Sequence, residues 1–505
     1  MTEVIVAKFG GSTIGQNGDQ IPTVIERIKA LRKEKKKIVA VFSAPLMEHE
    51  GKVKSMTDIA IHIGRKYASG QTVDTNILYR TYLNIAKKYL SQKYFEEFEF
   101  HLNKFYNYVT SSLNHVAQNK RFIDVTRSRI LAYGGEITMS YLMDYIMRSN
   151  GLKCDHVDIE KWPIITDDNF EAANFMLEES KEHKKHFLKL LEENEVISIG
   201  GFIGKTIDGL ETTYERGGSD RTAADIAIIL YDEFKVQIDF EKDNIVLSAD
   251  PKIVKKEELE SIRYLSYNEA RLAGMFGMKI LDPIAIKEID DNNFDIPIVI
   301  TSLLYPSDIT IIEKSLINRK YDFLDIVENE NKEEEEEEDS SLIKIVTGKR
   351  NCVIVRMESI AASHLIASLE KDKQYYNFLK LSPFKVDDIE ITRLLFLDAD
   401  YVKRHERHFK AFYPKVEFAY GKGVVTLIGD MMWKMPKIVS TASRTLGDYD
   451  INILNLDAQE ETSRILIIVD DIDNNVANAI RAIHLQRNKT DVKITHNNNN
   501  NNNNN

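Results

Sequence analysis

Residues 4–13 read VIVAKFGGST, an apolar run that ends in a pair of glycines. The apolar run predicts a buried β-strand, and Gly10 and Gly11 predict a tight turn where that strand ends. Adjacent glycines let the backbone approach a ligand closely, and their N–H groups can face phosphate oxygens. Lys8 adds a positive charge suited to phosphoryl transfer. A plain strand-to-helix turn with a solvated lysine explains the same letters, so both interpretations stay open at this point.

Further apolar runs alternate with helical segments along the first part of the chain. The runs that predict strands are residues 37–43, 154–159, 195–200, 236–240, 244–249 and 296–302. The segments that predict helices are residues 21–35, 76–117, 122–150, 172–192 and 219–232. Buried strands separated by helices of this length are typical of βαβ units. We therefore predict an α/β domain over residues 1–310, with a mainly parallel sheet sandwiched by helices.

Two low-complexity segments divide and end the rest of the chain. Residues 332–339 are almost entirely glutamate and cannot bury themselves, so we predict an acidic linker over residues 311–341. The asparagine run at residues 497–505 predicts a disordered tail without an assigned function.

The segment between the linker and the tail predicts two α+β modules. Residues 421–496 have the order strand, helix, strand, strand, helix, strand that is typical of a ferredoxin-like module. Its expected strands are 424–428, 451–456, 465–470 and 491–495, and its expected helices are 434–446 and 476–485. Residues 342–420 predict a related but more divergent module, with helices at 359–371 and 401–412.

Composition excludes several classes of protein. With 505 residues, 43% of them hydrophobic, the chain predicts a packed globular protein of several domains. A net charge of −12 does not favour phosphate backbones, so we expect no nucleic-acid partner. No apolar run is long enough to span a membrane and no cleavage signal opens the chain, so we expect a cytoplasmic protein without a membrane partner. Cys154 and Cys352 lie too far apart to suggest a disulfide framework or a thiolate metal site.

A second glycine pair lies in residues 216–220, which read RGGSD and precede a predicted helix. The free N–H groups at the N-terminus of that helix favour an anion. Arg216 presents a planar fork suited to a carboxylate. Ser219 is also a good N-cap residue, so a structural capping role is the alternative. Two glycine turns far apart in the chain, each with a cation and an acid or hydroxyl, favour a phosphate-binding site.

These motifs resemble those of the aspartate kinases, members of the amino-acid kinase superfamily that carry C-terminal ACT domains. Residues 8–13 resemble the KFGGTS opening of that family, with Ser and Thr exchanged. The other matching segments follow in the family's order: Ser43-Ala44 with Thr57-Asp58, Gly135-Glu136 with Met139-Ser140, residues 201–204, Thr212-Thr213 with residues 216–220, and residues 249–251, 265–269 and 277–281.

The resemblance implies a specific reaction. The γ-phosphoryl group of ATP would pass to the side-chain carboxylate of L-aspartate and give 4-phospho-L-aspartate, which opens the biosynthesis of lysine, threonine and methionine. It implies ATP and Mg²⁺, because the polyphosphate charge must be neutralised while the transferred group loosens. Two alternatives stay open: a non-catalytic amino-acid sensor derived from the kinase, and a kinase for another acidic amino acid.

Carried over residue by residue, the resemblance makes Lys8 and Asp220 the catalytic residues. Lys8 would meet the charge that develops on the transferred group. Asp220 would organise the cations and the substrate amine at the start of its helix. The residues expected to bind the nucleotide are Gly10, Gly11, Ser12, Lys252 and Lys279.

The residues expected to bind aspartate are Ser43, Glu136, Arg216 and Ser219. Ser43 would help to place the substrate, Arg216 would hold its α-carboxylate and Glu136 its ammonium group. As alternatives, Glu136 would be a solvated position on an amphipathic helix, and Arg216 would pair only with a surface acid. We predict no protein ligands for a resident metal ion.

Departures from the family pattern cluster on the nucleotide side. Glu241 and Lys242 replace the polar pair that normally faces the nucleotide, and Ile245 replaces the glycine of the next turn. A β-branched residue at a position that needs positive φ would be strained. Lys252 replaces an arginine, and Asp282 replaces a histidine. We therefore expect a remodelled ATP site or a weakened affinity for nucleotide.

The C-terminal part resembles paired ACT domains, which usually sense an end-product amino acid between subunits. Residues 456–463 depart from the family's ligand-binding stretch, so the effector stays open. Exposed strand edges in β-α-β modules favour association, and we expect a homodimer or a higher homo-oligomer.

Overall fold

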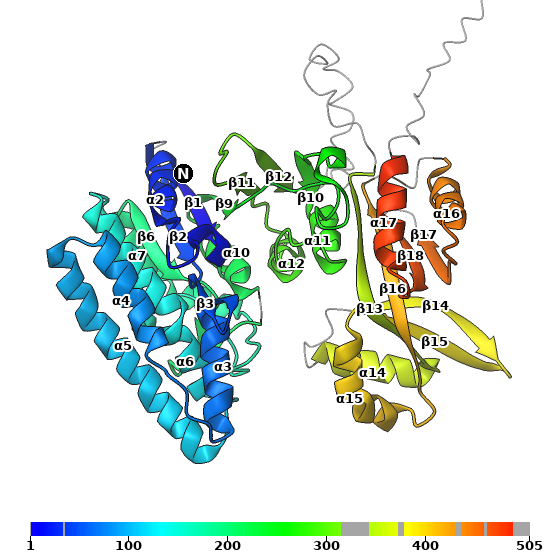
Figure 1. Ribbon diagram of the computed structural model, residues 1–505, viewed down its shortest axis with the longest axis horizontal. Coiled ribbons are helices and arrows are strands. Elements are labelled where there is room, and N and C mark those ends of the chain that lie inside the picture. Colours follow the sequence, from blue (N-terminus) through cyan, green and yellow to red (C-terminus); the bar gives the residue numbers. More distant parts are fainter. Residues whose placement is uncertain are drawn as a thin grey trace, which may run out of the picture. The chain divides into compact units, whose positions relative to one another are not determined.

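The computed structural model describes residues 2–33, 36–215, 217–314, 343–371, 378–430, 432, 436–458 and 462–487 (Figure 1). Within these ranges the chain forms two compact units. Unit 1 comprises residues up to 246 together with 263–271 and 281–314, and unit 2 comprises residues 247–262, 272–280 and 343–487. None of the helices in the described ranges is both long enough and apolar enough to cross a membrane.

Unit 1 is built on an eight-stranded sheet with the order β10-β12-β11-β9-β1-β2-β6-β5. All neighbouring strands run parallel except β11 and β12. This confirms the predicted mainly parallel sheet. The strands are β1 Glu3–Phe9, β2 Lys37–Phe42, β5 Cys154–His156, β6 Val196–Gly200, β9 Lys235–Lys242, β10 Tyr264–Ser266, β11 Ile298–Ser302 and β12 Ile309–Glu313.

The strand register brings the ends of the central strands to one edge of this sheet. Phe9 pairs with Phe42 and with Glu241, and Phe42 pairs with Gly200. These pairs are the last or next-to-last residues of their strands, so the loops that follow start at one level. Ligands of open parallel sheets bind at this carboxyl edge.

Helices flank the sheet, and two of them, α7 and α10, carry residues of the site described below. α7 contacts β5, β6 and β2, while α10 contacts β1, β2 and β9. The helices of unit 1 in chain order, of which α11 runs on into unit 2, are α1 Gly11–Ile14, α2 Ile21–Lys33, α3 Met56–Ala68, α4 Ile77–Tyr89, α5 Gln92–Asn119, α6 Val125–Gly134, α7 Glu136–Ser149, α8 Leu177–His183, α9 Lys185–Glu193, α10 Gly218–Leu230, α11 Tyr267–Met275 and α12 Pro283–Asp291. Two small hairpins complete the unit: β3 Leu46–His49 with β4 Lys52–Ser55, and β7 Ile203–Lys205 with β8 Glu211–Thr213.

Three predicted helices are each broken into two. The segment 76–117 is α4 and α5, because Leu90 and Ser91 adopt extended backbone between them. The segment 122–150 is α6 and α7, with a break at Gly135 (φ −133°, ψ −108°). A Cβ atom at Gly135 would lie 2.8 Å from the carbonyl oxygen of Leu131, so this sharp corner needs glycine. The segment 172–192 is α8 and α9.

Two predicted strands differ in the structure. The strand 154–159 stops at His156, and a 3₁₀ turn at Ile159–Lys161 follows it. The prediction of a strand at 244–249 is wrong, because this segment forms an isolated bridge between Leu247 and Ser261. Ala249 instead packs in the hydrophobic core of unit 2.

Unit 2 contains an antiparallel six-stranded sheet with the order β14-β15-β13-β16-β18-β17. Its α+β composition agrees with the predicted pair of ferredoxin-like modules. The strands are β13 Ile345–Glu358, β14 Phe378–Val386, β15 Ile389–Phe396, β16 Glu417–Ile428, β17 Asn455–Ala458 and β18 Arg464–Asp470. The helices are α14 Ser359–Lys371, α15 Ala399–Phe412, α16 Ile438–Asp448 and α17 Asn475–Gln486.

The long strands β13 and β16 run through both halves of this sheet. One core lies over the end of β13 with α14 and α15, and the other over its start with α16 and α17. The predicted module boundary at residue 420 therefore falls inside β16. Similarly, β12 extends to Glu313, past the predicted domain boundary at residue 310. The predicted linker from residue 315 on, the closing strand 491–495 and the asparagine tail lie outside the described residues.

Candidate active site

Lys8 and Asp220 form the centre of the site. Lys8 lies on β1 one residue before its end, and Asp220 lies in the first turn of α10. The Lys8 Nζ and Asp220 Oδ1 atoms are 2.7 Å apart, and the two side chains are only 12% and 11% exposed. Burial opposes ionisation of Asp220, but the charges of Lys8 and Lys242 outweigh it and hold the pKa of that carboxyl below its usual value. The two predicted catalytic residues are thus an ion pair.

The two glycine turns come close to other backbone and side-chain atoms of the site. A Cβ atom at Gly11 would lie 2.9 Å from the carbonyl oxygen of Ala44. Gly217 has φ +100°, and a Cβ atom there would lie 2.8 Å from Asp282 Oδ2. Both turns therefore need glycine, and they leave backbone N–H groups near Lys8 and Asp220.

Ser43 and Ser219 lie against each other at the same edge of the sheet. The Ser43 hydroxyl donates a hydrogen bond of 3.0 Å to the Ser219 hydroxyl oxygen. Gly201, which follows β6, allows this approach, since a Cβ atom there would lie 2.6 Å from Ser219 Cβ. The N-cap of α10 is Gly217, so the alternative role of Ser219 as the N-cap residue is wrong.

Glu136, the first residue of α7, is buried, so the alternative of a solvated helix position is wrong. Thr57 Oγ1 donates a hydrogen bond of 2.8 Å to Glu136 Oε1. Oε2 is buried and makes no hydrogen bond within the described part of the chain. Burial outweighs the hydrogen bonds of Thr57 and of backbone N–H groups and raises the pKa of Glu136 to about 7. Its backbone touches the end of β6, because a Cβ atom at Gly200 would lie 2.9 Å from Glu136 O.

Three further residues contribute to the site but are not among the predicted site residues: Thr57, Lys242 and Asp282. Each lies in a matching motif or in a departure from the family pattern. Lys242 ends β9 at the level of the glycine turn. Burial lowers the pKa of Lys242 to about 8; the Asp220 charge opposes this shift and the Lys8 charge adds to it. The backbone N–H of Asp282 donates to Asp220 Oδ2 at 3.1 Å. Burial and the neighbouring Asp220 charge raise the pKa of Asp282 to about 6.

Glu241, which departs from the family pattern, lies buried in unit 1 and is paired there. Arg27 Nε donates to Glu241 Oε1 at 2.7 Å, and the Glu241 side chain is fully buried. Thr13 Oγ1 donates to the carbonyl oxygen of Glu241 at 2.9 Å, which joins the first glycine turn to β9. Ile245 is not among the described residues with positive φ, so the strain expected there does not occur.

The roles of four other predicted residues, Ser12, Arg216, Lys252 and Lys279, are not tested by the contacts of the described residues. Arg216 lies outside the described residues. Ser12 is exposed on α1. Lys252 and Lys279 are exposed and belong to unit 2, so their roles stay predictions.

Comparison with known proteins identifies the chain's relatives. The model of the amino acid kinase family matches residues 3–302. A bifunctional aspartokinase/homoserine dehydrogenase of Arabidopsis thaliana is 27% identical over 304 residues, which cover 59% of this chain and 31% of that protein. An aspartokinase of Chlamydia muridarum is 26% identical over 300 residues, which cover 59% of this chain and 60% of that protein. The chain thus spans less than two thirds of the length of these relatives.

Among solved structures, the aspartokinase III of E. coli in complex with aspartate and ADP has a similar fold. It superposes with a TM-score of 0.72 at 18% identity, and the match covers 95% of this chain and 99% of that chain. The similarity confirms the amino-acid kinase fold of unit 1 and the α+β character of unit 2.

Proposed function

The chain belongs to the amino acid kinase family, and from this premise we propose that it is an aspartate kinase. The enzyme transfers the γ-phosphoryl group of ATP to the β-carboxylate of L-aspartate and forms 4-phospho-L-aspartate. The observation that carries the proposal is the buried Glu136 carboxylate, whose Oε2 atom makes no hydrogen bond among the described residues, at the same sheet edge as the Lys8–Asp220 ion pair. The names of the sequence relatives support the same activity.

Glu136 suits the ammonium group of an amino acid. A buried carboxylate with one free oxygen gains most from a ligand that brings a positive charge and N–H donors. The Ser219 hydroxyl accepts from Ser43, so its own O–H can donate to a carboxylate oxygen of the same ligand. Arg216, at the start of the second glycine turn, is the proposed partner of the α-carboxylate.

The Lys8 side of the site suits phosphoryl transfer. Asp220 fixes the Lys8 ammonium group at 2.7 Å, which places a positive charge where negative charge develops on the transferred group. The N–H groups of the glycine turns add donors for phosphate oxygens. MgATP enters as a substrate, and its Mg²⁺ neutralises phosphate charge when bound. The carboxylates of Asp220 and Asp282 are the oxygen donors that Mg²⁺ prefers. The protein's own contribution is positioning and electrostatics.

Further properties follow from this activity as parts of the proposal. The reaction would open the biosynthesis of lysine, threonine and methionine in the cytoplasm. The α+β modules of unit 2 would bind an end-product amino acid, and the protein would act as a homodimer or higher homo-oligomer.

A coupled ADP-release assay tests the proposal. We expect ADP release that depends on L-aspartate, with little release when L-glutamate or N-acetylglutamate replaces it. Equal rates with glutamate would instead indicate a kinase for another acidic amino acid. Aspartate binding by titration calorimetry without any binding of MgATP at millimolar concentration would indicate a sensor.

A further inference from the structure

The hairpin of β3 and β4 and the helix α3 bring two histidines to one carboxylate. His49 ends β3, Glu50 follows in the turn, and His62 lies on α3. The Glu50 Oε1 atom is 3.3 Å from His62 Nε2 and 4.0 Å from His49 Nε2. One ligand atom from each of the three residues lies within 4.8 Å of the others.

We propose that His49, Glu50 and His62 bind a divalent transition-metal ion of the zinc class. Bonds from Zn²⁺ to histidine nitrogen and carboxylate oxygen are about 2.0–2.2 Å long, so two tetrahedral ligand atoms lie roughly 3.3–3.5 Å apart. The His62–Glu50 distance already has this value, and the longer His49–Glu50 distance needs a small side-chain rotation. Two imidazoles and one carboxylate leave one coordination position for water.

A second observation points to a ligand at this cluster. The Nε2 atom of His49 is shielded from solvent, and within the described ranges it makes no hydrogen bond. A shielded imidazole nitrogen without a hydrogen bond is unfavourable, and a bond to a metal ion would satisfy it. Lys54 pairs with the other carboxylate oxygen, Glu50 Oε2, at 3.2 Å and leaves Oε1 toward the two imidazoles. The exposed Lys54–Glu50 ion pair contributes little to stability, so a metal ion bound at Glu50 could replace it at little cost.

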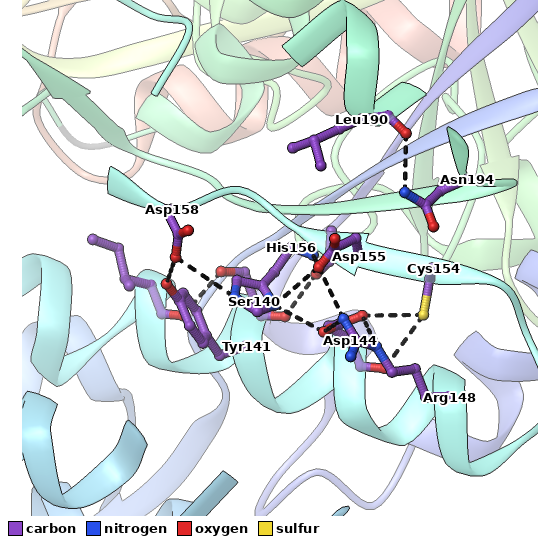
Figure 2. Close-up of polar contacts among 12 residues, drawn as sticks. Ser140, Tyr141, Asp144, Arg148, Cys154, Asp155, His156, Asp158, Leu190 and Asn194 are labelled. Carbon is purple, nitrogen blue, oxygen red and sulfur yellow. Dashed lines mark hydrogen bonds and ion pairs between the residues drawn. The ribbon is translucent and has the colours of Figure 1, made fainter. Parts of the chain in front are cut away.

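A second cluster of similar composition is already paired internally and serves as a comparison. Asp144, Asp155 and His156 also bring three possible ligand atoms together. Arg148 Nη2 lies 2.7 Å from Asp144 Oδ2 and 2.8 Å from Asp155 Oδ1, and His156 Nδ1 lies 2.8 Å from Asp144 Oδ2 (Figure 2). A metal ion there would have to expel a bound guanidinium group, whereas no described arginine pairs with Glu50, and Lys54 contacts only its other oxygen.

The hairpin connects the proposed metal site to the proposed acceptor site. At its base the backbone N–H of Met56 donates to the carbonyl oxygen of Pro45 at 3.0 Å. The next residue, Thr57, holds Glu136. A metal ion at the tip would tie the hairpin to α3 and restrict the segment that carries Thr57. Any effect on aspartate binding rests on the proposed kinase function, whereas metal binding itself does not.

Titration of the full chain without an affinity tag tests the site. We expect one equivalent of Zn²⁺ by calorimetry, and Co²⁺ absorption bands of a histidine-ligated, low-coordinate ion that Zn²⁺ abolishes. His49→Ala and His62→Ala should each weaken the affinity at least about tenfold. The matched control is His115→Ala, since His115 is exposed on α5 and contacts Asn119 at 2.8 Å.

The outcome is decided by binding, independently of kinase activity. Circular dichroism melting should show that each variant stays folded, and Glu50→Gln offers a variant that keeps both histidines. Absence of Zn²⁺ binding to the wild-type chain would overturn the proposal. Equal Zn²⁺ affinity of the wild-type chain and the His49→Ala/His62→Ala double variant would overturn it as well.

Discussion

Helix α7 carries two buried carboxylates with opposite surroundings. Asp144 is fully buried, and each of its oxygens has partners: Oδ1 accepts from Arg148 Nε at 3.0 Å and from Cys154 Sγ at 3.1 Å, and Oδ2 pairs with Arg148 and His156 (Figure 2). Glu136, the first residue of the helix, has one oxygen bound to Thr57 and the other without a hydrogen bond among the described residues.

The surroundings also shift the proton equilibria in different ways. Burial disfavours a charged imidazole, but hydrogen bonds to Asp144 and Asp158 outweigh it and raise the pKa of His156 to about 9. The Asp144 cluster is thus internally paired, which suits a structural role. Burial raises the pKa of Glu136 to about 7, and among the described residues no cation pairs with this carboxylate. Of two buried acids on one helix, the incompletely paired one is the candidate for binding a ligand.

The largest expected effect is on stability and comes from the paired acid. Asp144→Ala removes the carboxylate that neutralises Arg148 and His156, and breaking a buried ion pair typically costs about 3–5 kcal/mol. Urea denaturation should show this loss in the free energy of unfolding. Glu136→Ala serves as the control, because no described residue forms an ion pair with its carboxylate, so its removal leaves no described cation unpaired. Equal losses for the two variants would remove the distinction between the two acids.

The next effect is on aspartate binding. Glu136→Gln keeps the shape of the side chain but removes its charge, and a hydrogen bond to a charged group is worth about 1.5–3 kcal/mol. We expect the KM for aspartate to rise by roughly 10–150-fold, with a much smaller change in the KM for ATP, as measured by initial rates. An unchanged aspartate KM would show that Glu136 does not hold the substrate amine.

A pH profile tests the raised pKa of Glu136. The ionised form must bind the ammonium group, so kcat/KM for aspartate should rise up to about pH 7 and then level off. The free energy of unfolding should depend on pH in the opposite direction. Because the pKa of Glu136 is raised in the folded state, its contribution to stability is fully present below about pH 4.5 and is lost as the pH rises to about 7. Glu136→Gln should abolish both dependences, and a profile unchanged by this substitution would assign the titration to another group.

The smallest effect concerns the hydrogen bond from Thr57. Thr57→Val removes a donor to Glu136 Oε1 that favours the ionised carboxylate, and such a bond contributes about 0.5–1.5 kcal/mol. The kcat/KM profile should therefore move to higher pH by up to about one unit. Thr57→Ser, which keeps the hydroxyl, is the matched control and should leave the profile in place. A shift to lower pH would contradict the assigned role.

The sequence predicted the part of the site that follows strand ends. Lys8 and Ser43 lie at the ends of apolar runs, and parallel strands must bring such positions to one edge. The second glycine pair was predicted from its place before a helix, which is α10. The family resemblance supplied Glu136, whose burial no local pattern revealed. Gly135 was hidden inside a continuous helical periodicity, so the break between α6 and α7 was missed.

Other features depend on pairings that the sequence does not display. Ala249 and Val254 are apolar and could pack in the core of either unit, and the neighbouring sequence does not indicate that they pack in unit 2. The partners of Asp144 come from its own helix and from β5, so the network depends on how these two elements meet. The pairing of Glu241 with Arg27 likewise joins residues far apart in the chain.

The most direct measurement is the trapping of the acyl phosphate with hydroxylamine. The central claim predicts that the wild-type chain, with MgATP and L-aspartate, forms β-aspartyl hydroxamate, and that Lys8→Met, folded by circular dichroism, forms very little. ADP release without the hydroxamate, or equal hydroxamate formation by the Lys8→Met variant, would contradict the claim.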